Sequence, residues 1–544
     1  MAPRDARPNG HDPDMAYWEG ISSEIGDLAP DTELRPTVRV TAGAVDKLST
    51  EAERVLMLSC QPIYQRGHTL VRPVCTVVPA SRGRTTLAAG LADISPVAMV
   101  DRMARAACWQ KYDGRNKSWR PTDPPEKVAH IILSRVGEWS FPAIAGVITT
   151  PTLRADGSLL TAPGYDPATR LYHFADPNTD ILQKIPTNPT KSHAEAALAE
   201  LQYILKNFPF VSETDHAVGL SALLTPIARG AIPVAPMHAF RASTAGTGKT
   251  YLIDVVSALA TARPCPVATV AKTEEETEKR LGGLLLAAFP LICLDNVNGE
   301  LGGDLLCQAI ERPLVQIRPL GASTIAEVET RATVFATGNA LRVRGDMTRR
   351  TLIANLDAGV ERPELRSFDF DPVEVVLADR ARYVGAALTI LLAHAEARYP
   401  GADNISPLAS FTDWSRIVRA ALVWLGCADP CPSMDEARDD DPDLLDLKEL
   451  LDAWKQEIGT LECLTTADLV SRISDKQYTD HDAPYTCSRL RDFVLRVANR
   501  RGMVDSKLLG MFLRAKSGRI INGLSLVTQS RAHGGSPKWQ LKEK

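Results

Sequence analysis

A glycine-rich turn at residues 243–250, with the sequence STAGTGKT, is the strongest chemical feature of the chain. It follows an apolar run (234–240) and opens a segment with helical spacing, so its backbone N–H groups and the helix N-terminus can surround phosphate oxygens. Lys249 can reach the β- and γ-phosphates, and the Thr250 hydroxyl can ligate Mg²⁺. Ser243 stands where the G-x-x-x-x-G-K-[ST] pattern has its first glycine. The predicted ATP contacts are Ser243, Thr244, Ala245, Gly246, Thr247, Gly248, Lys249, Thr250 and Tyr251.

A second apolar run, LICL at 291–294, ends in Asp295. A carboxylate at the C-terminal end of a parallel strand can hold Mg²⁺ beside the phosphate loop, so Thr250 and Asp295 are the predicted Mg²⁺ residues. The next residue, Asn296, stands where many ATPases carry a glutamate that activates water. An amide can orient a water molecule but cannot accept its proton. Glu275 and Glu276 are candidates for a helping carboxylate, with a solvated helix face as the alternative.

A third apolar run, ATVFATGN at 332–339, ends in Asn339, whose amide is placed to contact a γ-phosphate or the attacking water. Ten residues later comes the pair Arg349–Arg350. A guanidinium suits a γ-phosphate whose charge spreads in the transition state. The predicted catalytic residues are therefore Lys249, Asp295, Asn296, Asn339, Arg349 and Arg350.

The elements that must position these side chains are short apolar strands alternating with helical segments over about 209–372, preceded by an amphipathic helix at 193–208. This alternation indicates an α/β fold with a mostly parallel sheet. Before it, the run 71–80 favours a strand and the segment 96–109 has helical spacing. After it, 373–400 is expected to form one long helix, and the acidic stretch 435–446 a linker or a helix start.

Composition excludes several classes of protein. Of 544 residues, 44% are hydrophobic and 24% charged, which is ordinary for a globular protein. No apolar stretch reaches the roughly 20 residues of a membrane span, the N-terminus lacks a signal-peptide core, and ten scattered cysteines favour a reducing cytosol. Secreted, membrane and disulfide-scaffold classes are therefore not expected.

Charge is unevenly distributed along the chain. Residues 489–544 contain 13 Lys/Arg and 3 Asp/Glu, so this block carries +10 while the whole chain carries −4. The segment 461–544, which includes this block, predicts three helices (466–473, 485–502 and 506–516) followed by two strands, the order of a winged helix-turn-helix. Many such domains bind protein, but the basic charge favours DNA. The predicted DNA contacts here are Arg500, Arg501, Lys507, Arg514, Lys516 and Arg519.

The series STAGTGKT (243–250), LICLDN (291–296), ATGN (336–339) and TRR (348–350) resembles AAA+ ATPases. More narrowly, it is similar to the superfamily three helicases of viruses, phages and plasmids, including poxvirus-type primase-helicases. This resemblance implies a hexameric ring with ATP at subunit interfaces, Asn339 as a sensor, and Arg349 or Arg350 as an arginine finger acting on the neighbouring subunit. It also implies that a hairpin over 315–330, turning at Gly321, grips DNA in the pore. The basic candidates for gripping DNA are Arg318, which flanks the hairpin turn, and Lys272, which lies outside the hairpin.

The predicted architecture is thus an α/β protein with an AAA+ P-loop core. Its divisions are a flexible N-terminus (1–30), an α+β accessory domain (31–192), the ATPase (193–372), a helical region (373–460) and a winged helix (461–544). The accessory domain has no assigned role, and without an apolar-flanked Asp-x-Asp pair we expect no primase centre in it.

We expect an ATP- and Mg²⁺-dependent DNA helicase or translocase, a ring-forming homo-oligomer that replicates a phage, plasmid or mobile element. Its expected location is the cytoplasm of a bacterial or phage-infected cell. The alternative is an ATP-binding, DNA-binding assembly switch, either a loader or a defence sensor, with little hydrolysis.

Overall fold

The structure is a computed structural model and describes residues 35–79, 85–175, 180–271, 273–319, 324–476, 484–529 and 536–544. The predicted flexible N-terminus, Lys272 and the hairpin turn at 320–323 lie outside the described residues. No helix among the described residues is long and apolar enough to cross a membrane.

Five parallel strands form the central sheet, which confirms the predicted α/β class. Their order across the sheet is β13 (Val267–Thr269), β14 (Leu291–Asp295), β18 (Thr333–Gly338), β12 (Met237–Ala242) and β20 (Thr351–Leu356). The strands are continuous apolar runs because helices cover both faces of the sheet. β18 lies between β12 and β14, so the ends of the three predicted active-site strands are neighbours.

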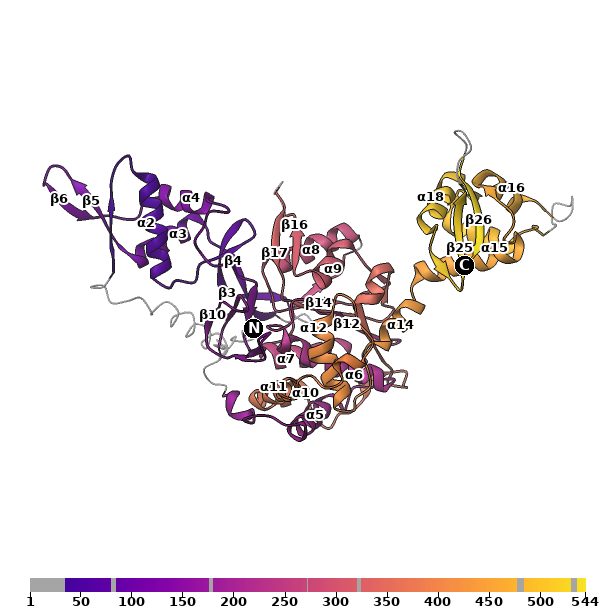
Figure 1. Cartoon of the computed structure of the whole chain (residues 1–544), viewed down its shortest axis with the longest axis horizontal. Coiled ribbons are helices and arrows are strands. Elements are labelled where there is room, and N and C mark those ends of the chain that lie inside the picture. Colours follow the sequence, from indigo (N-terminus) through magenta and orange to yellow (C-terminus); the bar gives the residue numbers. More distant parts are fainter. Residues whose placement is uncertain are drawn as a thin grey trace, which may run out of the picture.

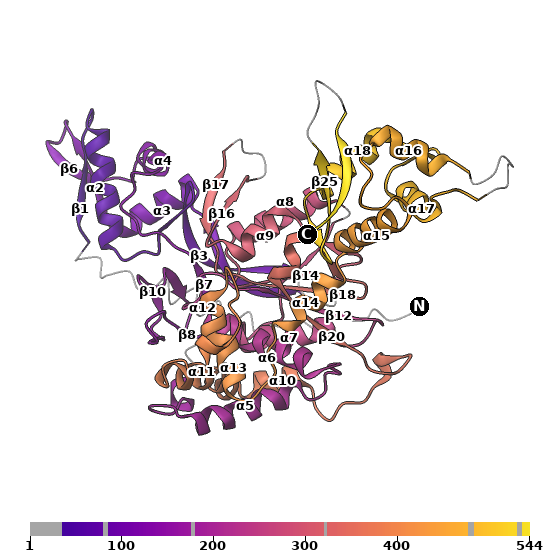
Figure 2. The same ribbon diagram turned by 45° about the vertical axis from the view of Figure 1, so that its right-hand side comes forward.

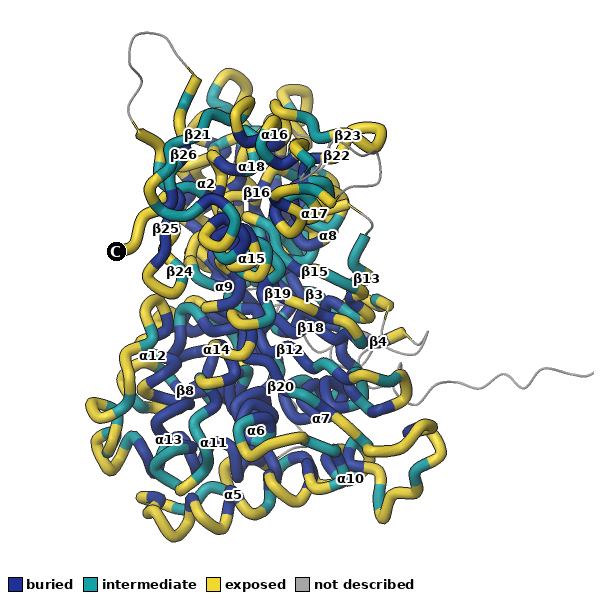
Figure 3. The backbone as a smooth tube through the Cα atoms, turned by 90° about the vertical axis from the view of Figure 1, so that its right-hand side faces the viewer, coloured by how far each residue is buried: buried dark blue, intermediate teal, exposed yellow. Residues whose placement is uncertain are grey.

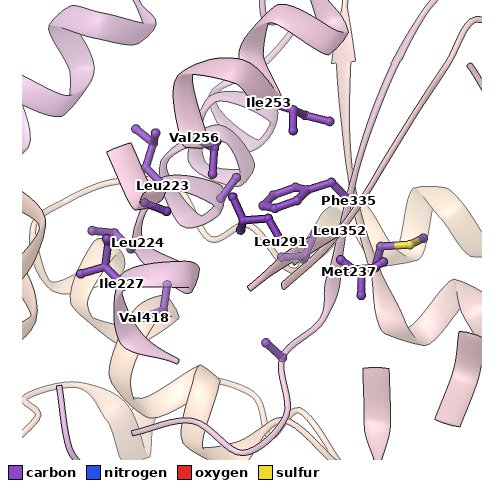
Figure 4. Packing of buried hydrophobic residues seen from close by; sticks show 14 of the residues in the cluster. Leu223, Leu224, Ile227, Met237, Ile253, Val256, Leu291, Phe335, Leu352 and Val418 are labelled. Atoms are coloured by element: carbon purple, nitrogen blue, oxygen red, sulfur yellow. The ribbon is translucent and has the colours of Figure 1, made fainter. Parts of the chain in front are cut away.

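Helices cover the sheet on both sides (Figure 1). The lower group in that view is α5 (Lys191–Leu205), α6 (Glu213–Ala228), α7 (Lys249–Thr261), α10 (Pro372–Ala378) and α11 (Arg380–Glu396). The upper group is α8 (Glu274–Leu286) and α9 (Asp304–Glu311). Ile253 and Val256 of α7 pack toward Leu291 and Phe335 of the sheet, in one buried core (Figure 4).

The expected single helix over 373–400 is divided at Asp379 into α10 and α11. Asp379 has a non-helical backbone (φ −139°), and its side chain accepts a hydrogen bond from the Arg382 backbone N–H, so it caps α11. The following helices are α12 (Thr412–Trp414), a π-helical turn at Ser415–Arg419, α13 (Ala420–Trp424) and α14 (Pro432–Asp439). From Val376 to Ala437 this region shares the core of the central sheet.

The region before α5 contains one sheet that shares a core with three helices, and several further sheets. Strands β1 (Thr37–Val40), β5 (Cys108–Asp113) and β6 (Ser118–Pro121) pack against α2 (Val45–Leu58), α3 (Pro96–Ala106) and α4 (Glu126–Ser134). The other sheets are built from β2 (Tyr64–Arg66), β3 (Thr69–Pro79), β4 (Thr85–Asp93), β7 (Gly146–Ile148), β8 (Thr152–Leu153), β9 (Leu159–Leu160), β10 (Gly164–Asp166) and β11 (Leu171–His173). The helix expected over 96–109 ends at Ala106, because the chain then becomes extended and pairs with β1.

The C-terminal unit has its own core. It contains α15 (Pro442–Glu457), α16 (Thr466–Ser474), α17 (Ser488–Val497) and α18 (Ser506–Lys516). Its strands are β21 (Leu464–Thr465), β22 (Asn499–Arg500), β23 (Met503–Val504), β24 (Ile520–Ile521), β25 (Leu524–Gln529) and β26 (Lys538–Glu543). The acidic stretch at 435–446 is largely helical, and Leu447, Leu450 and Trp454 of α15 join the C-terminal core.

Three projections rise from the same side of the central sheet (Figure 2). They are the α2–α4 unit, the hairpin of β16 (Leu314–Ile317) and β17 (Ala326–Glu329), and the C-terminal unit. The hairpin strands pair antiparallel, as expected from the sequence. Figure 3 shows the buried tube concentrated around α6, β12 and β20, below these projections.

Candidate active site

The phosphate-loop residues connect β12 directly to α7. Gly246 and Gly248 have φ angles of +77° and +100°, a region that residues with a Cβ rarely adopt. Gly248 is the N-cap of α7, and Lys249 is its first residue. The sequence therefore places a glycine at each point where the loop needs a left-handed backbone, with the helix N-terminus facing the loop.

The loop is closed by its own hydrogen bonds. Thr247 Oγ1 donates to the Thr244 carbonyl at 2.8 Å, and Lys249 Nζ donates to the same carbonyl at 3.2 Å. Lys249 is only 8% exposed. Burial lowers the pKa of this amine, and the nearby Asp295 carboxylate partly opposes the shift. The lysine charge is thus held inside the loop, next to Asp295.

Asp295 is held by hydroxyl groups from two different elements. The Thr250 hydroxyl, on α7, donates to Asp295 Oδ1 at 2.9 Å, and the Thr337 hydroxyl, on β18, donates to the same oxygen at 2.5 Å. Thr337 Oγ1 also accepts a hydrogen bond from the Asn296 backbone N–H at 3.1 Å. The structure therefore brings the two predicted Mg²⁺ residues together. A hydroxyl beside a carboxylate is a hard oxygen pair of the kind that Mg²⁺ prefers.

Thr337 was not predicted from the sequence as a site residue. It is 1% exposed and lies two residues before Asn339. Its contact with Asp295 depends on β18 pairing with β14, which no local pattern reveals. The polar Thr337 within the apolar run ATVFATG was the only available signal.

Asn339 follows the C-terminal end of β18 and is half-buried. The backbone before Asn339 can approach the turn after Asp295 only because residue 338 is a glycine. A Cβ at Gly338 would lie 2.1 Å from the Val297 carbonyl oxygen. The Val297 N–H in turn donates to the Thr337 carbonyl at 2.7 Å. The end of β18 is thus pressed against the turn after Asp295, and Asn339 emerges between the strands that carry the phosphate loop and Asp295.

Asn296 is exposed and has a φ of +55°. Asparagine tolerates this left-handed conformation better than glutamate does. The candidate helpers Glu275 and Glu276 lie in the first turn of α8, where they pair with Lys279 at 2.8 Å and Arg280 at 3.4 Å. All four side chains are about half exposed or more, so these contacts fit the alternative that Glu275 and Glu276 belong to a solvated helix face.

The two predicted arginines differ sharply in environment. Both lie in the 3₁₀ helix η4 (Gly345–Arg350). The Arg350 side chain is 4% exposed, and its Nε donates to Glu311 Oε2 at 2.8 Å and its Nη1 to the Asp346 carbonyl at 2.7 Å. The Arg349 side chain is 53% exposed and pairs with Asp346 at the surface. Hydrogen bonds from Arg349 are the largest cause that lowers the pKa of Asp346 to about 2.

Burial alone would raise the pKa of Glu311, but hydrogen bonds from Ser410 and Arg350 lower it overall. Glu311 therefore stays ionised as the partner of Arg350. This buried pair fixes η4 against α9, which leaves Arg349 as the arginine presented to the exterior.

The segment after β20 passes over the phosphate loop. A Cβ at Gly246 would lie 3.1 Å from Glu364 Cβ and 3.3 Å from Glu364 Oε2. Glu364 also pairs with Arg362 at 3.0 Å. Further along, Asp371 accepts a hydrogen bond from Tyr251, the predicted contact at the start of α7. The sequence did not indicate that this segment would reach the loop.

The hairpin candidate Arg318 is exposed and directly follows β16. It contributes to an open groove of about 820 Å³ between α8, α9 and the hairpin, with Glu275, Lys279, Asp304 and Gln316 also in its lining. The second candidate, Lys272, lies outside the described residues, as does the hairpin turn.

Five of the six C-terminal candidates are exposed: Arg500, Arg501, Lys507, Arg514 and Arg519. The sixth, Lys516, is 7% exposed, and its Nζ contacts Asp443 Oδ1 at 2.5 Å. Its place in the sequence beside Arg514 hides this burial, because Lys516 lies on the face of α18 that meets α15. We therefore assign Lys516 to packing between these helices and remove it from the DNA-binding set.

No family model matches the chain, and no curated protein matches it. Among solved structures, the A-form apo structure of the NrS-1 C-terminal region is 9% identical with a TM-score of 0.34, covering 86% of this chain and 95% of that one. SCCmec type IV Cch, described as an active helicase, is 11% identical with a TM-score of 0.34, covering 89% and 97%. Similarity at this level assigns no activity to this chain.

Proposed function

We propose that this protein is an ATP-dependent DNA helicase or translocase that acts in the replication of a phage, plasmid or integrated mobile element. One observation carries the ATPase part. Thr250 and Thr337 converge on Asp295 Oδ1 beside the loop that holds Lys249. Phosphate-binding and metal-binding groups thus meet at the carboxyl edge of a parallel sheet, where nucleotides bind in open α/β folds.

The residues fit ATP and Mg²⁺. The two left-handed glycines give the loop the turn that phosphate-binding backbone N–H groups need, and Lys249, which donates to the Thr244 carbonyl, would donate to a bound phosphate instead. Thr250 and Asp295 would hold Mg²⁺, which supplies charge neutralisation at the β- and γ-phosphates when bound. Thr337 acts through Asp295 and is a positioning residue. In this proposal, Asn339 and Asn296 would orient the attacking water by hydrogen bonding.

Arg349 is proposed as the arginine finger for the nucleotide of the neighbouring subunit in a homo-oligomeric ring, a hexamer by the family resemblance. Its guanidinium is about half exposed, whereas that of Arg350 is committed to Glu311. A finger that acts in trans must reach across an interface, and an exposed arginine on a fixed short helix meets that requirement. Arg350 then serves to hold η4 in place.

The DNA part of the proposal rests on charge and shape. The basic C-terminal unit presents Arg500, Arg501, Lys507, Arg514 and Arg519 to solvent, where they can contact phosphates through a winged-helix arrangement. The β16–β17 hairpin projects from the same side of the central sheet (Figure 2), and Arg318 directly follows β16 on the side of the hairpin turn. A single strand in the ring pore would meet this hairpin.

The test measures ATPase activity with and without single-stranded DNA, together with strand displacement on a forked duplex. Wild type should show DNA-stimulated hydrolysis and displacement. Lys249→Ala should lose both, because the phosphate loop loses its cation. Lys448→Ala, an exposed lysine on α15, is the matched control and should behave as wild type. Equal activity of wild type and Lys249→Ala would reject the proposal.

Asn296 favours a second candidate function, an ATP-driven assembly switch with little hydrolysis. A water-activating carboxylate at this position is replaced by an amide in a left-handed turn. ATP-dependent oligomers without measurable turnover would favour the switch. Turnover at the rate of ordinary helicases would exclude it.

A further inference from the structure

One face of the sheet of β1, β5 and β6 carries aromatic and polar side chains that contact one another. Arg39 pairs with Gln110 across β1 and β5, and Tyr112 pairs with Trp119 across β5 and β6. Directly opposed residues lie on the same face of a sheet. Arg39, Gln110, Tyr112 and Trp119 therefore share one face, which we name the β5–β6 platform.

The opposite face of this sheet makes the core of the unit. Val38 and Trp109 are 0% and 4% exposed, and the Trp109 indole donates to the Met103 carbonyl at 2.8 Å. Because side chains alternate along a strand, the residues next to them point away from the helices. Tyr112 is accordingly 49% exposed. The platform lies at the outer end of the unit, away from the central sheet (Figure 1).

The aromatic rings and the arginine of the platform are already arranged together. The Arg39 guanidinium lies over the Trp119 ring, 4.8 Å from its centroid. The Tyr112 and Trp119 rings meet edge to face, with centroids 5.4 Å apart. Flat aromatic rings and guanidinium planes are the groups on which unstacked nucleic-acid bases stack.

The segment that carries Tyr112 and Trp119 is rich in basic residues. The segment 108–121 contains four basic residues and one acidic residue: Lys111, Arg115, Lys117, Arg120 and Asp113. All four basic residues are exposed. Asp113 is occupied within the turn, where it accepts hydrogen bonds from Asn116 Nδ2 at 2.7 Å and the Arg115 N–H at 3.0 Å, and pairs with Arg120 at 3.2 Å. Lys111 and Arg120 oppose each other on the other face of the sheet, whereas Arg115 and Lys117 lie in the turn between β5 and β6. The segment is net positive as a whole, which favours a polyanion.

We propose that the β5–β6 platform binds single-stranded nucleic acid, with bases stacked on Tyr112, Trp119 and the Arg39 plane and phosphates held by the surrounding cations. Exposed aromatic side chains with a stacked arginine and basic residues in the adjoining turn match the way sequence-tolerant single-strand sites are built. Duplex offers its phosphates but keeps its base faces covered. The platform therefore prefers a single strand.

This site gives a role to the region that precedes the ATPase. It extends the DNA-binding part of the proposed function but needs no nucleotide at the phosphate loop. The platform unit and the β16–β17 hairpin project from the same side of the central sheet (Figure 2).

The test uses the full-length protein without ATP and a 20-residue oligothymidine that carries iododeoxyuridine at its centre. Photocrosslinking followed by peptide mapping should place an adduct on Tyr112 or Trp119. By fluorescence anisotropy, Tyr112→Leu and Trp119→Leu should each weaken binding about fivefold or more, because a stacked base contributes about 1–3 kcal/mol. Tyr112→Phe, which keeps the ring, should bind as wild type.

Arg105→Gln is the charge control, since Arg105 is exposed on α3 and pairs with Asp101 outside the platform. It should leave binding unchanged. Crosslinks confined to other parts of the chain, or equal affinity of wild type and both leucine variants, would overturn the proposal. Displacement of the oligonucleotide by polyglutamate of equal charge would overturn it as well, because the surface would then be an acidic-protein site.

Loss of DNA-stimulated ATPase activity with the platform crosslink intact would reject the proposed function and leave this site standing. DNA-stimulated ATPase activity without a crosslink on Tyr112 or Trp119 would reject only the platform.

Discussion

At the scale of single residues, the site depends on one carboxylate oxygen that two hydroxyl groups hold in place. Asp295 Oδ1 accepts from Thr250 on the helix and from Thr337 on the neighbouring strand. The first contact follows from the motif, since Thr250 directly follows the predicted lysine. The second depends on strand pairing. Thr337 is thus the site residue that the structure adds to those predicted from the sequence.

Replacing Thr337 with valine should lower kcat for ATP about tenfold or more. Hydrogen bonds to charged groups contribute about 1.5–3 kcal/mol, and each 1.36 kcal/mol corresponds to a factor of ten in rate. Thr337→Ser should restore most of the activity, which a purely structural role would not require. Thr333→Val is the control, because the buried Thr333 hydroxyl on the same strand has no partner among the described residues. An unchanged Mg²⁺ dependence and kcat in Thr337→Val would contradict the role of Thr337.

Glu364 gives a second expectation at this scale. Its carboxylate lies against the phosphate loop at Gly246, where it opposes a triphosphate by charge. Glu364→Gln should lower the KM for ATP about two- to fivefold, the size of an exposed charge interaction, and the difference should shrink at high salt. Glu361→Gln, an exposed change in the same segment, should leave KM unaffected. A raised KM in Glu364→Gln would show that the carboxylate assists binding.

At the scale of elements, the strand that carries the phosphate loop contains a buried histidine. His238 of β12 is 0% exposed, its Nε2 lies 2.9 Å from Ser221 Oγ, and its ring lies near those of Phe335 and Trp414. Burial lowers the pKa of His238 to about 3. The imidazole is therefore neutral at physiological pH and packs in the core.

This buried histidine makes stability depend on pH. As pH falls below about 6.5, His238 binds a proton in the unfolded chain but stays neutral in the folded chain. The contribution of His238 to the free energy of unfolding is therefore fully present above that pH and is lost progressively toward pH 3. Between pH 6.5 and 5 the loss from His238 is of order 2 kcal/mol. His238→Gln should flatten this part of the curve, measured as the free energy of unfolding in urea. Identical slopes for the two proteins would show that His238 is not the titrating group.

Elements also show where sequence-based prediction succeeds and fails. The phosphate loop was predictable because its glycines, lysine and threonine act through consecutive backbone positions. The division at Asp379 was missed because the apolar spacing continues across it while one side-chain cap interrupts the helix. Arg350 and Lys516 resemble their exposed neighbours in the sequence, and only contacts with Glu311 and Asp443 reveal their burial.

At the scale of the whole molecule, the basic C-terminal unit is tied to the element that carries Arg349. The Gly345 N–H donates to Asp441 at 3.2 Å, and Asp443 lies between Arg344 at 3.6 Å and Lys516 at 2.5 Å. The start of α15 thus contacts both η4 and α18. The C-terminal unit is therefore joined to the element that carries the proposed arginine finger by contacts of Asp441 and Asp443.

The basic residues are also concentrated on particular units of the molecule. The block 489–544 carries +10, and its exposed arginines lie on a unit with a separate core that projects beside the hairpin. The β5–β6 platform adds a second basic surface at the other end of the molecule. Neither surface is visible in the net charge of −4.

The central claim is that each ATP site is shared between two subunits, with Lys249 from one and Arg349 from its neighbour. The most direct measurement is the DNA-stimulated ATPase activity of an equal mixture of Lys249→Ala and Arg349→Ala proteins, allowed to assemble together. Each variant alone should be inactive. In mixed rings about a quarter of the interfaces regain both groups, since each interface takes different surfaces from its two subunits. Recovered activity is the predicted result, and an inactive mixture whose subunits have exchanged would contradict the claim.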